Sequence, residues 1–273
     1  MRLTTVRWDG VTRAARVDDD TCVLLDAPDA ISAVVAGLTE PVGHATTVAL
    51  ADADLAPVVP RPPKIICLGL NYEPHIREMG RELPEHPTCF AKYAVALTGP
   101  RDDIVLPAVA SQPDYEAELA VVIGRPARNI DACDAADVIA GYTVMNDISM
   151  RDYQFRSMQW LQGKTFEATT PLGPVLVTGD EIDDARDLAI SCLVDDEQRQ
   201  SARTGELVFA PPDVVAYLSA IMTLEPGDVI ATGTPGGVGA GTDPPRFLRP
   251  GQVVRTRIEG IGELINACVA EAG

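Results

Sequence analysis

The feature that most constrains this chain is residues 114–124, a short apolar run that carries two glutamates. The run is rich in β-branched residues, opens after Pro113 and closes at Gly124, which predicts one β-strand. Side chains alternate between the two faces of a strand, so Glu116 and Glu118 point the same way. Two adjacent carboxylates repel each other unless a proton or a cation lies between them. The run therefore predicts either a cation site or, alternatively, a solvent-facing edge with two ordinary acids.

A second predicted strand, residues 141–147, supplies a third carboxylate. It ends in Asn146 and Asp147, which places the aspartate at a strand end. Carboxylate oxygens suit hard cations such as Mg²⁺, Mn²⁺ or Ca²⁺. Three such ligands would leave coordination positions open for water and substrate. The second strand therefore favours the cation interpretation over the exposed edge.

The charge of the chain restricts its partners. Its 273 residues carry a formal net charge of −18, and aromatic residues make up only 5%. Such an acidic chain is a poor ligand for nucleic acid or an anionic membrane, and few aromatics are available for base stacking. We therefore expect no nucleic-acid and no membrane partner. An anionic substrate would need local positive charge, supplied by a cation and a few placed arginines and lysines.

The six cysteines show no CxxC spacing and lie in or near apolar runs, which predicts reduced core or near-core residues in a cytoplasmic protein. The first residues lack a signal-peptide apolar region. No apolar run approaches the ~20 residues needed to cross a bilayer. The six are Cys22, Cys67, Cys89, Cys133, Cys192 and Cys268.

Composition and turn residues divide the chain in two. Residues 1–60 predict a small β-rich domain, with a meander of strands at 3–8, 12–17 and 22–25. A helix is expected at 30–38, closed near Gly37. Prolines cluster between residues 57 and 63, and we place the domain boundary there. The main domain then covers residues 61–273.

The main domain opens with a predicted buried strand at 64–70. Asn71 is expected to cap a helix over residues 72–79. His75 and Glu78 are three residues apart, hence neighbours on one helix face. They form either a catalytic pair or an ordinary surface pair. A glycine-rich loop at 233–239 is either an anion-binding loop or a tight turn.

Other predicted elements are mostly strands, without regular βαβ alternation, so the expected class is α+β, mostly β. Strands are expected at 88–92, 103–106, 175–178, 188–194, 228–231, 253–258 and 262–269. Helices are expected at 134–139, in part of 155–162, and at 211–221.

The chain contains, in order, the motifs Asn71-Tyr72-x-x-His75-x-x-Glu78, Asp114-Tyr115-Glu116-x-Glu118, Asn146-Asp147, Arg151-Asp152-x-Gln154, Gln162-Gly163-Lys164 and Gly233-Thr234-Pro235-x-Gly237-Val238-Gly239. Together these motifs resemble the fumarylacetoacetate hydrolase family from about Lys64 to the C-terminus. The resemblance implies a mixed β-roll with a small N-terminal β domain, a bound Mg²⁺, Mn²⁺ or Ca²⁺, and a homodimer.

The resemblance also implies roles for individual residues. The metal ligands would be Glu116, Glu118 and Asp147. Glu78 would orient His75 as general base, and Lys164 would stabilise an oxyanion. The substrate would be held by Tyr72, Arg151, Gln154 and Thr234.

The reaction that the resemblance favours is hydrolysis of an acylpyruvate, such as fumarylpyruvate, to pyruvate and a carboxylic acid in aromatic catabolism. The partner is then a small anionic 2-oxo acid. Two alternatives use the same metal site: isomerisation of 2-hydroxyhepta-2,4-diene-1,7-dioate and decarboxylation of an oxaloacetate-like acid. A metal-stabilised binding protein is the non-enzymatic alternative.

Overall fold

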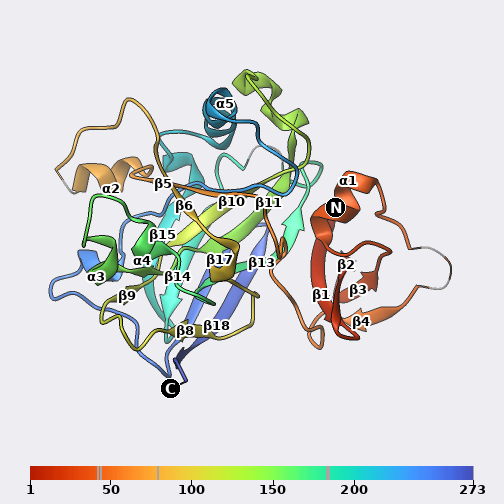
Figure 1. Cartoon of the computed structure of the whole chain (residues 1–273), viewed down its shortest axis with the longest axis horizontal. Coiled ribbons are helices and arrows are strands. Elements are labelled where there is room, and N and C mark those ends of the chain that lie inside the picture. Colours follow the sequence, from red (N-terminus) through yellow and green to blue (C-terminus); the bar gives the residue numbers. More distant parts are fainter. Residues whose placement is uncertain (42, 44, 79, 183–184, 273) are drawn as a thin grey trace.

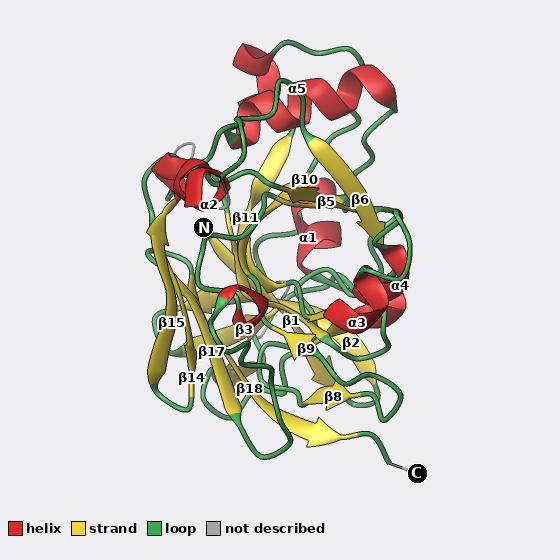
Figure 2. Cartoon of the chain, turned by 90° about the vertical axis from the view of Figure 1, so that its left-hand side faces the viewer, coloured by secondary structure: helices red, strands yellow, loops and turns green. Residues whose placement is uncertain are grey.

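The computed structural model describes residues 1–41, 43, 45–78, 80–182 and 185–272. Within these residues strands outnumber helices, and parallel and antiparallel pairs occur together. The helices are short and lie around the strands (Figure 2). The expected α+β, mostly β fold with mixed strand directions is therefore confirmed.

The larger sheet has eleven strands in the described part of the chain. They are β1 Arg2–Trp8, β2 Val11–Asp18, β3 Thr21–Leu24, β4 Thr47–Ala49, β5 Ile65–Gly69, β6 Thr88–Lys92, β7 Leu97–Thr98, β10 Ala117–Ile123, β11 Ile139–Asn146, β13 Thr170–Val177 and β16 Val229–Ala231. Their order is β4-β3-β2-β1-β13-β11-β10-β16-β5-β6, with β7 beside β13. The pairs β16–β5 and β7–β13 are parallel. This sheet carries the acidic strand β10 near its middle.

A second sheet of five described strands packs against the first. They are β8 Ile104–Leu106, β14 Ala189–Val194, β15 Glu197–Arg203, β17 Val253–Ile258 and β18 Gly262–Ala270. Their order is β15-β14-β17-β18-β8. Leu119 and Val144 of the first sheet share a buried core with Cys192 and Leu264 of the second. This shared core fixes β10 and β11 against β14 and β18.

The helices are α1 Ala30–Ala36, α2 Glu73–Glu78, α3 Arg151–Gln154, α4 Leu161–Lys164 and α5 Pro211–Ile221, with 3₁₀ turns η1 Ala94–Ala96, η2 Ala132–Asp137, η3 Thr204–Glu206 and η4 Gly239–Gly241. The prediction at 211–221 is confirmed. The short helix expected at 134–139 is present as the 3₁₀ helix η2, but it ends at Asp137, because the β-branched Val138 and Ile139 favour extended backbone and Ile139 opens β11. Of residues 155–162, expected to be helical in part, Leu161 and Gln162 are helical and begin α4, whereas α3 ends just before Phe155.

The N-terminal strands β1–β4 and helix α1 form a lobe on one side of the molecule (Figure 1). Helix α1 is capped at both ends, and its C-terminal end lies at Gly37 as the sequence predicts. The Asp29 carboxylate accepts the Ser32 N–H, and Gly37 ends the helix at a φ of 68°. The helix is thus shorter than the expected 30–38, because the left-handed residue stops it before Leu38.

The lobe does not have a sheet of its own. Strand β1 pairs with β13 through Arg2–Val177 and Leu3–Leu176, so one sheet continues from the lobe into the rest of the chain. The division into residues 1–60 and 61–273 stays a prediction.

The single strand expected at 114–124 is interrupted. A short strand β9 Pro113–Asp114 pairs with β12 Ser149–Met150, and β10 begins at Ala117. Side chains accept the N–H groups of the two residues between them, while the Glu116 carbonyl oxygen still accepts the Asp147 N–H at 2.8 Å. The Asp114 carboxylate accepts the Tyr115 N–H, and Asn146 Oδ1 accepts the Glu116 N–H. The backbone therefore bends where the first metal-ligand candidate stands.

All six cysteines are free thiols. Four are buried, but Cys89 and Cys133 are exposed, so the expectation of core positions is wrong for these two. Cys89 lies on the edge strand β6, whose burial alternates along its length, and Cys133 lies on the surface turn η2. Among the described helices, none is long and apolar enough to cross a membrane.

Candidate active site

Three buried carboxylates meet at the ends of β10 and β11. Glu116, Glu118 and Asp147 are 6%, 1% and 0% exposed, and each offers an oxygen within 4.8 Å of the others. The antiparallel pair Ala117–Asn146 brings them together, because Glu116 and Glu118 flank one partner and Asp147 follows the other. The interpretation of the glutamates as a solvent-facing edge is therefore wrong. The structure assembles the three residues expected to bind a metal.

Three cations neutralise part of this cluster. The Lys164 ammonium lies 2.6 Å from a Glu116 oxygen and 2.8 Å from an Asp147 oxygen. Lys92 donates to the other Asp147 oxygen at 2.6 Å, and Arg151 lies 2.6 Å from the second Glu116 oxygen. Although burial opposes it, Lys164 and Lys92 lower the pKa of Asp147 to about 2. Asp147 is thus held as a carboxylate, and Glu116 is ion-paired with Lys164 and Arg151.

Glu118 has a different environment. It forms no ion pair with any residue that the structure describes, and it accepts the Gly233 N–H at 2.9 Å. Burial, then the charges of Asp147 and Glu116, raise the pKa of Glu118 well above its ordinary value. The three carboxylates and the three cations balance in formal charge, but each cation pairs with Glu116 or Asp147 and no described cation pairs with Glu118. A divalent ion with a preference for oxygen, such as Mg²⁺ or Mn²⁺, fits this donor set.

Lys92 was not expected from the sequence. It is the last residue of a predicted strand, and no motif marks it. Its ammonium is fully buried, donating also to the Ile148 carbonyl oxygen. A lysine closing an apolar strand is a weak signal, because most such side chains reach solvent. Only the pairing with Asp147 shows its place in the site.

Arg151 and Gln154, both expected to hold substrate, lie on α3 beside the cluster. The Arg151 Nε donates to Asp114 at 2.9 Å, and its Nη1 donates to Gln154 Oε1 at 2.9 Å. Asp114 in turn accepts the N–H groups of Gly239 and Ala240. The sequence predicts no separate role for Asp114. In the structure it ties the arginine to the glycine-rich loop.

The predicted pair His75–Glu78 lies on α2 and is not hydrogen-bonded. The closest atoms, His75 Nδ1 and Glu78 Oε2, are 3.8 Å apart, which is beyond hydrogen-bond distance. Gly236 lies close to both: a Cβ there would stand 3.1 Å from Glu78 Oε2 and 3.3 Å from His75 Nδ1. The glycine-rich loop therefore packs directly on the pair.

Two buried polar atoms of the same segment have no partner among the described residues. They are the Tyr72 hydroxyl and His75 Nδ1. Burial, then the charge of Glu118, raise the pKa of the Tyr72 phenol, which keeps it a hydrogen-bond donor. Buried polar groups without partners are uncommon in native proteins, so both are available to a ligand.

Asn71 does not cap the helix as expected. Its side chain donates to the Phe209 and Thr232 carbonyl oxygens and accepts the Phe209 N–H. It therefore ties the chain just before α2 to two distant stretches of chain. The expected end of this helix at Met79 lies outside the described residues.

Thr234 lies in the glycine-rich loop, where its hydroxyl accepts a hydrogen bond from Gln200 at 2.8 Å. The loop leads out of β16, and Gly233 begins it at a φ of 100°, a backbone conformation that favours glycine. Glu118, His75 and Thr234 thus belong to one neighbourhood, linked through this loop.

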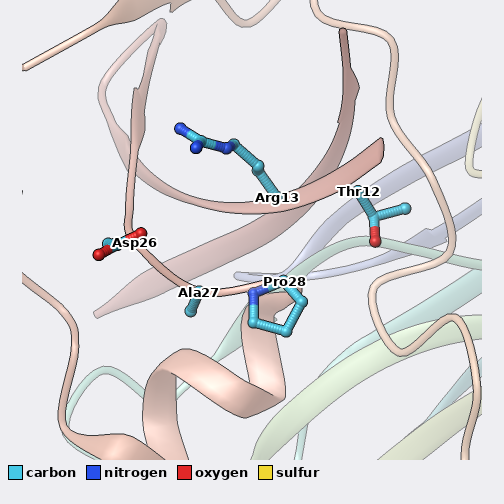
Figure 3. Close-up of a pocket in the computed structure, with 5 residues that line it drawn as sticks. All are labelled: Thr12, Arg13, Asp26, Ala27 and Pro28. Carbon is cyan, nitrogen blue, oxygen red and sulfur yellow. The ribbon is translucent and has the colours of Figure 1, made fainter. Parts of the chain in front are cut away.

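Two cavities lie outside this neighbourhood. One of about 220 Å³ in the N-terminal lobe is lined by Thr12, Arg13, Asp26, Ala27 and Pro28 (Figure 3). The other, of about 260 Å³, is lined by Arg186, Thr204, Gly205, Leu207, Ala210, Pro211 and Asp213. Neither lining includes a residue expected in the site.

Comparison with known proteins identifies the family of the chain. The family model described as fumarylacetoacetate (FAA) hydrolase C-terminal matches residues 64–269. A mitochondrial oxaloacetate tautomerase of Rattus norvegicus is 47% identical over 216 residues, covering 79% of this chain and 69% of that protein. One from Homo sapiens is 46% identical over 217 residues, with the same coverage.

Solved structures agree over the whole chain. Fumarylacetoacetate hydrolase from the psychrophile Exiguobacterium antarcticum matches with a TM-score of 0.90 at 34% identity, over 99% of this chain and 100% of its own. The 2-hydroxyhepta-2,4-diene-1,7-dioate isomerase of Mycobacterium marinum matches with a TM-score of 0.82 at 34% identity, over 100% of both chains. The similarity therefore includes the N-terminal lobe.

Proposed function

The chain belongs to the fumarylacetoacetate hydrolase family, and we propose that it interconverts the enol and keto forms of oxaloacetate or a similar 2-oxo acid. The observation that carries the proposal is the buried cluster of Glu116, Glu118 and Asp147, with two unpartnered proton-carrying groups nearby. Relatives at 46–47% identity bear the name oxaloacetate tautomerase, which supports this reaction over the others considered.

The three carboxylates would hold the divalent cation. The chemistry that such an ion supplies is stabilisation of negative charge on the enolate oxygen of a 2-oxo acid. Lys92, Lys164 and Arg151 balance the negative charge of the ligands, so a dianionic substrate meets less repulsion than the net charge of −18 suggests. Oxaloacetate suits this arrangement because both of its forms carry two carboxylates.

Tautomerisation needs one proton removed and one delivered, with no net change in composition. In the enol-to-keto direction the enol oxygen loses its proton and the C2–C3 double bond takes up a proton at C3. His75 Nδ1 has no partner among the described residues and is our choice for carrying the proton. The Tyr72 hydroxyl donates a hydrogen bond to a substrate oxygen. Thr234 and the loop N–H groups hold the far carboxylate.

Cleavage of the C–C bond in an acylpyruvate, expected from the sequence, is the second candidate. The observation that favours it is the pairing of His75 with Glu78 on α2, since a histidine oriented by a carboxylate activates water. The separation of 3.8 Å would have to shorten when substrate binds.

One experiment separates these reactions. Purified protein is mixed with the enol of oxaloacetate, with Mn²⁺ or with EDTA, and the ultraviolet absorbance of the enol is followed. We expect Mn²⁺-dependent loss of enol without release of CO₂ or pyruvate. Acetylpyruvate, fumarylpyruvate and 2-hydroxyhepta-2,4-diene-1,7-dioate are tested in parallel. Loss of enol at the buffer rate, with rapid formation of two acids from an acylpyruvate, would establish the hydrolase instead.

Assembly and location belong to the same proposal. We infer a homodimer in the cytoplasm, acting on small anions without nucleic acid or membrane. Light scattering of the purified protein measures the first point, and cell fractionation measures the second. The relatives named above are mitochondrial proteins by name, so fractionation should include organelles where the source cell has them.

A further inference from the structure

Gln200 is a buried polar residue that lies outside every motif singled out in the sequence. It stands on β15 of the five-stranded sheet and is 1% exposed. A buried amide without partners would cost free energy, so the groups that satisfy it are informative. Those groups belong to two parts of the candidate site that are far apart in the sequence.

The Gln200 amide bridges these two parts. Its Oε1 accepts the N–H of Ala117 at 3.0 Å, and its Nε2 donates to Thr234 Oγ1 at 2.8 Å and the Pro235 carbonyl oxygen at 2.9 Å. The orientation of the amide is fixed, because a backbone N–H can only donate and a carbonyl oxygen can only accept. The amide oxygen is thus bonded to the residue between Glu116 and Glu118, and the amide nitrogen is bonded to the glycine-rich loop.

The loop also rests on the backbone beside Gln200. A Cβ at Gly237 would come within 2.1 Å of the Arg199 carbonyl oxygen and 3.4 Å of Gln200 Cα. A side chain there would have to displace backbone, so only glycine allows this approach. The glycine-rich loop therefore packs on strand β15, and the Gln200 side chain links β15 to β10.

We propose that Gln200 is a positioning residue that couples the carboxylate cluster to the substrate-binding loop. By accepting the Ala117 N–H it fixes the backbone between two metal ligands. By donating to Thr234 and Pro235 it fixes the loop that binds the substrate carboxylate. The second role rests on the proposed function, whereas the first rests on the cluster alone.

The test uses a neutral variant of similar shape, Q200M, which makes neither set of hydrogen bonds. Calorimetry measures the binding of Mn²⁺ and then, at saturating Mn²⁺, of oxalate, whose two adjacent oxygens mimic the enolate of a 2-oxo acid. We expect each affinity to fall about tenfold. The KM for the oxaloacetate enol should rise, with a smaller change in kcat.

A matched control is N266L. Asn266 is also 1% exposed, lies on β18, and donates to the carbonyl oxygens of Gly99 and Asp102, away from the candidate site. N266L should lose comparable thermal stability yet bind Mn²⁺ and oxalate like the wild type. Equal binding losses in Q200M and N266L would reduce Gln200 to a structural residue and overturn the proposal.

A shorter amide keeps the test decisive if Q200M does not fold. Q200N stays polar and neutral but lacks the length to reach both ends, so the same weakening is expected. Unchanged affinity for both Mn²⁺ and oxalate in a folded variant would refute the coupling. Wild-type protein that binds both ligands without converting oxaloacetate would refute the proposed reaction and leave the role of Gln200 standing.

Discussion

Replacing Glu118 with glutamine removes a carboxyl group whose charged form is disfavoured in the buried cluster, and it keeps the shape of the side chain. Glu116, Glu118 and Asp147 have oxygens within 4.8 Å of one another. Two unit charges at that separation repel each other by about 3.5 kcal/mol at an effective dielectric constant near 20. Lys164 offsets part of this repulsion. We therefore expect E118Q to raise the free energy of unfolding of the metal-free protein by about 1–3 kcal/mol.

The same substitution should have the opposite effect when metal is present. A ligand at a thousand times its dissociation constant stabilises the native state by about 4.1 kcal/mol, which exceeds the gain of about 1–3 kcal/mol that E118Q is expected to show without metal. E118Q lacks one anionic oxygen ligand, so it should gain much less from the same Mn²⁺ concentration. The order of stability should then reverse: variant above wild type in EDTA, wild type above variant in Mn²⁺.

Urea unfolding at neutral pH, with EDTA or with Mn²⁺, measures both effects. E73Q is a matched control, because Glu73 is a partly exposed glutamate on α2 that pairs with Arg77 and lies outside the cluster. It should change stability little under either condition. If E118Q were less stable than wild type in EDTA, repulsion among the three carboxylates would not be lowering the free energy of unfolding of the wild-type protein. An undiminished gain from Mn²⁺ would remove Glu118 from the ligand set.

Three further predictions concern other parts of the molecule. His75→Gln should lower turnover about a hundredfold while Mn²⁺ affinity is unchanged, and calorimetry with kinetics checks both. Burial raises the pKa of Asp102, but a hydrogen bond from Arg7 and one from a backbone N–H leave it below 3.8. Wild type should therefore be more stable than D102N by about 1 kcal/mol at pH 7. That advantage should disappear as pH falls below 3.8, as acid titration of unfolding will show. A thiol reagent should label Cys89 and Cys133 quickly in native protein and the other four cysteines only in urea, as peptide mapping will show.

The central feature of the site was predictable because it depends on local spacing. Glu116 and Glu118 stand two residues apart on an apolar run, and strand geometry puts them on one side. Asp147 follows from the end of the next strand. The structure shows the three together, and their role as ligands stays a prediction.

What the sequence left out depends on partners that are distant along the chain. The break before Ala117 needs the Asn146 side chain, which replaces a ladder hydrogen bond with its own. Lys92 is the last residue of the edge strand β6. It belongs to the site because its side chain points inward and pairs with Asp147. The Asn71 side chain was expected to cap the helix that follows it, but it forms hydrogen bonds with backbone more than a hundred residues away. The spacing of residues along the sequence does not predict such long-range contacts.

The exposed cysteines illustrate a different limit. An apolar neighbourhood in sequence predicted burial, but burial on an edge strand alternates residue by residue. Cys89 faces outward while Lys92 faces inward, the reverse of what hydropathy alone indicates.

The pairing of β1 with β13 has a consequence for any shortened form of this protein. Without its first sixty residues, the backbone amides and carbonyls of Leu176 and Val177 would lose their neighbour and become an open flank. A second molecule can pair one of its own strands with such an open edge, and this pairing leads to aggregation. The N-terminal lobe thus protects the sheet that carries the carboxylates, even though none of its residues takes part in the chemistry proposed.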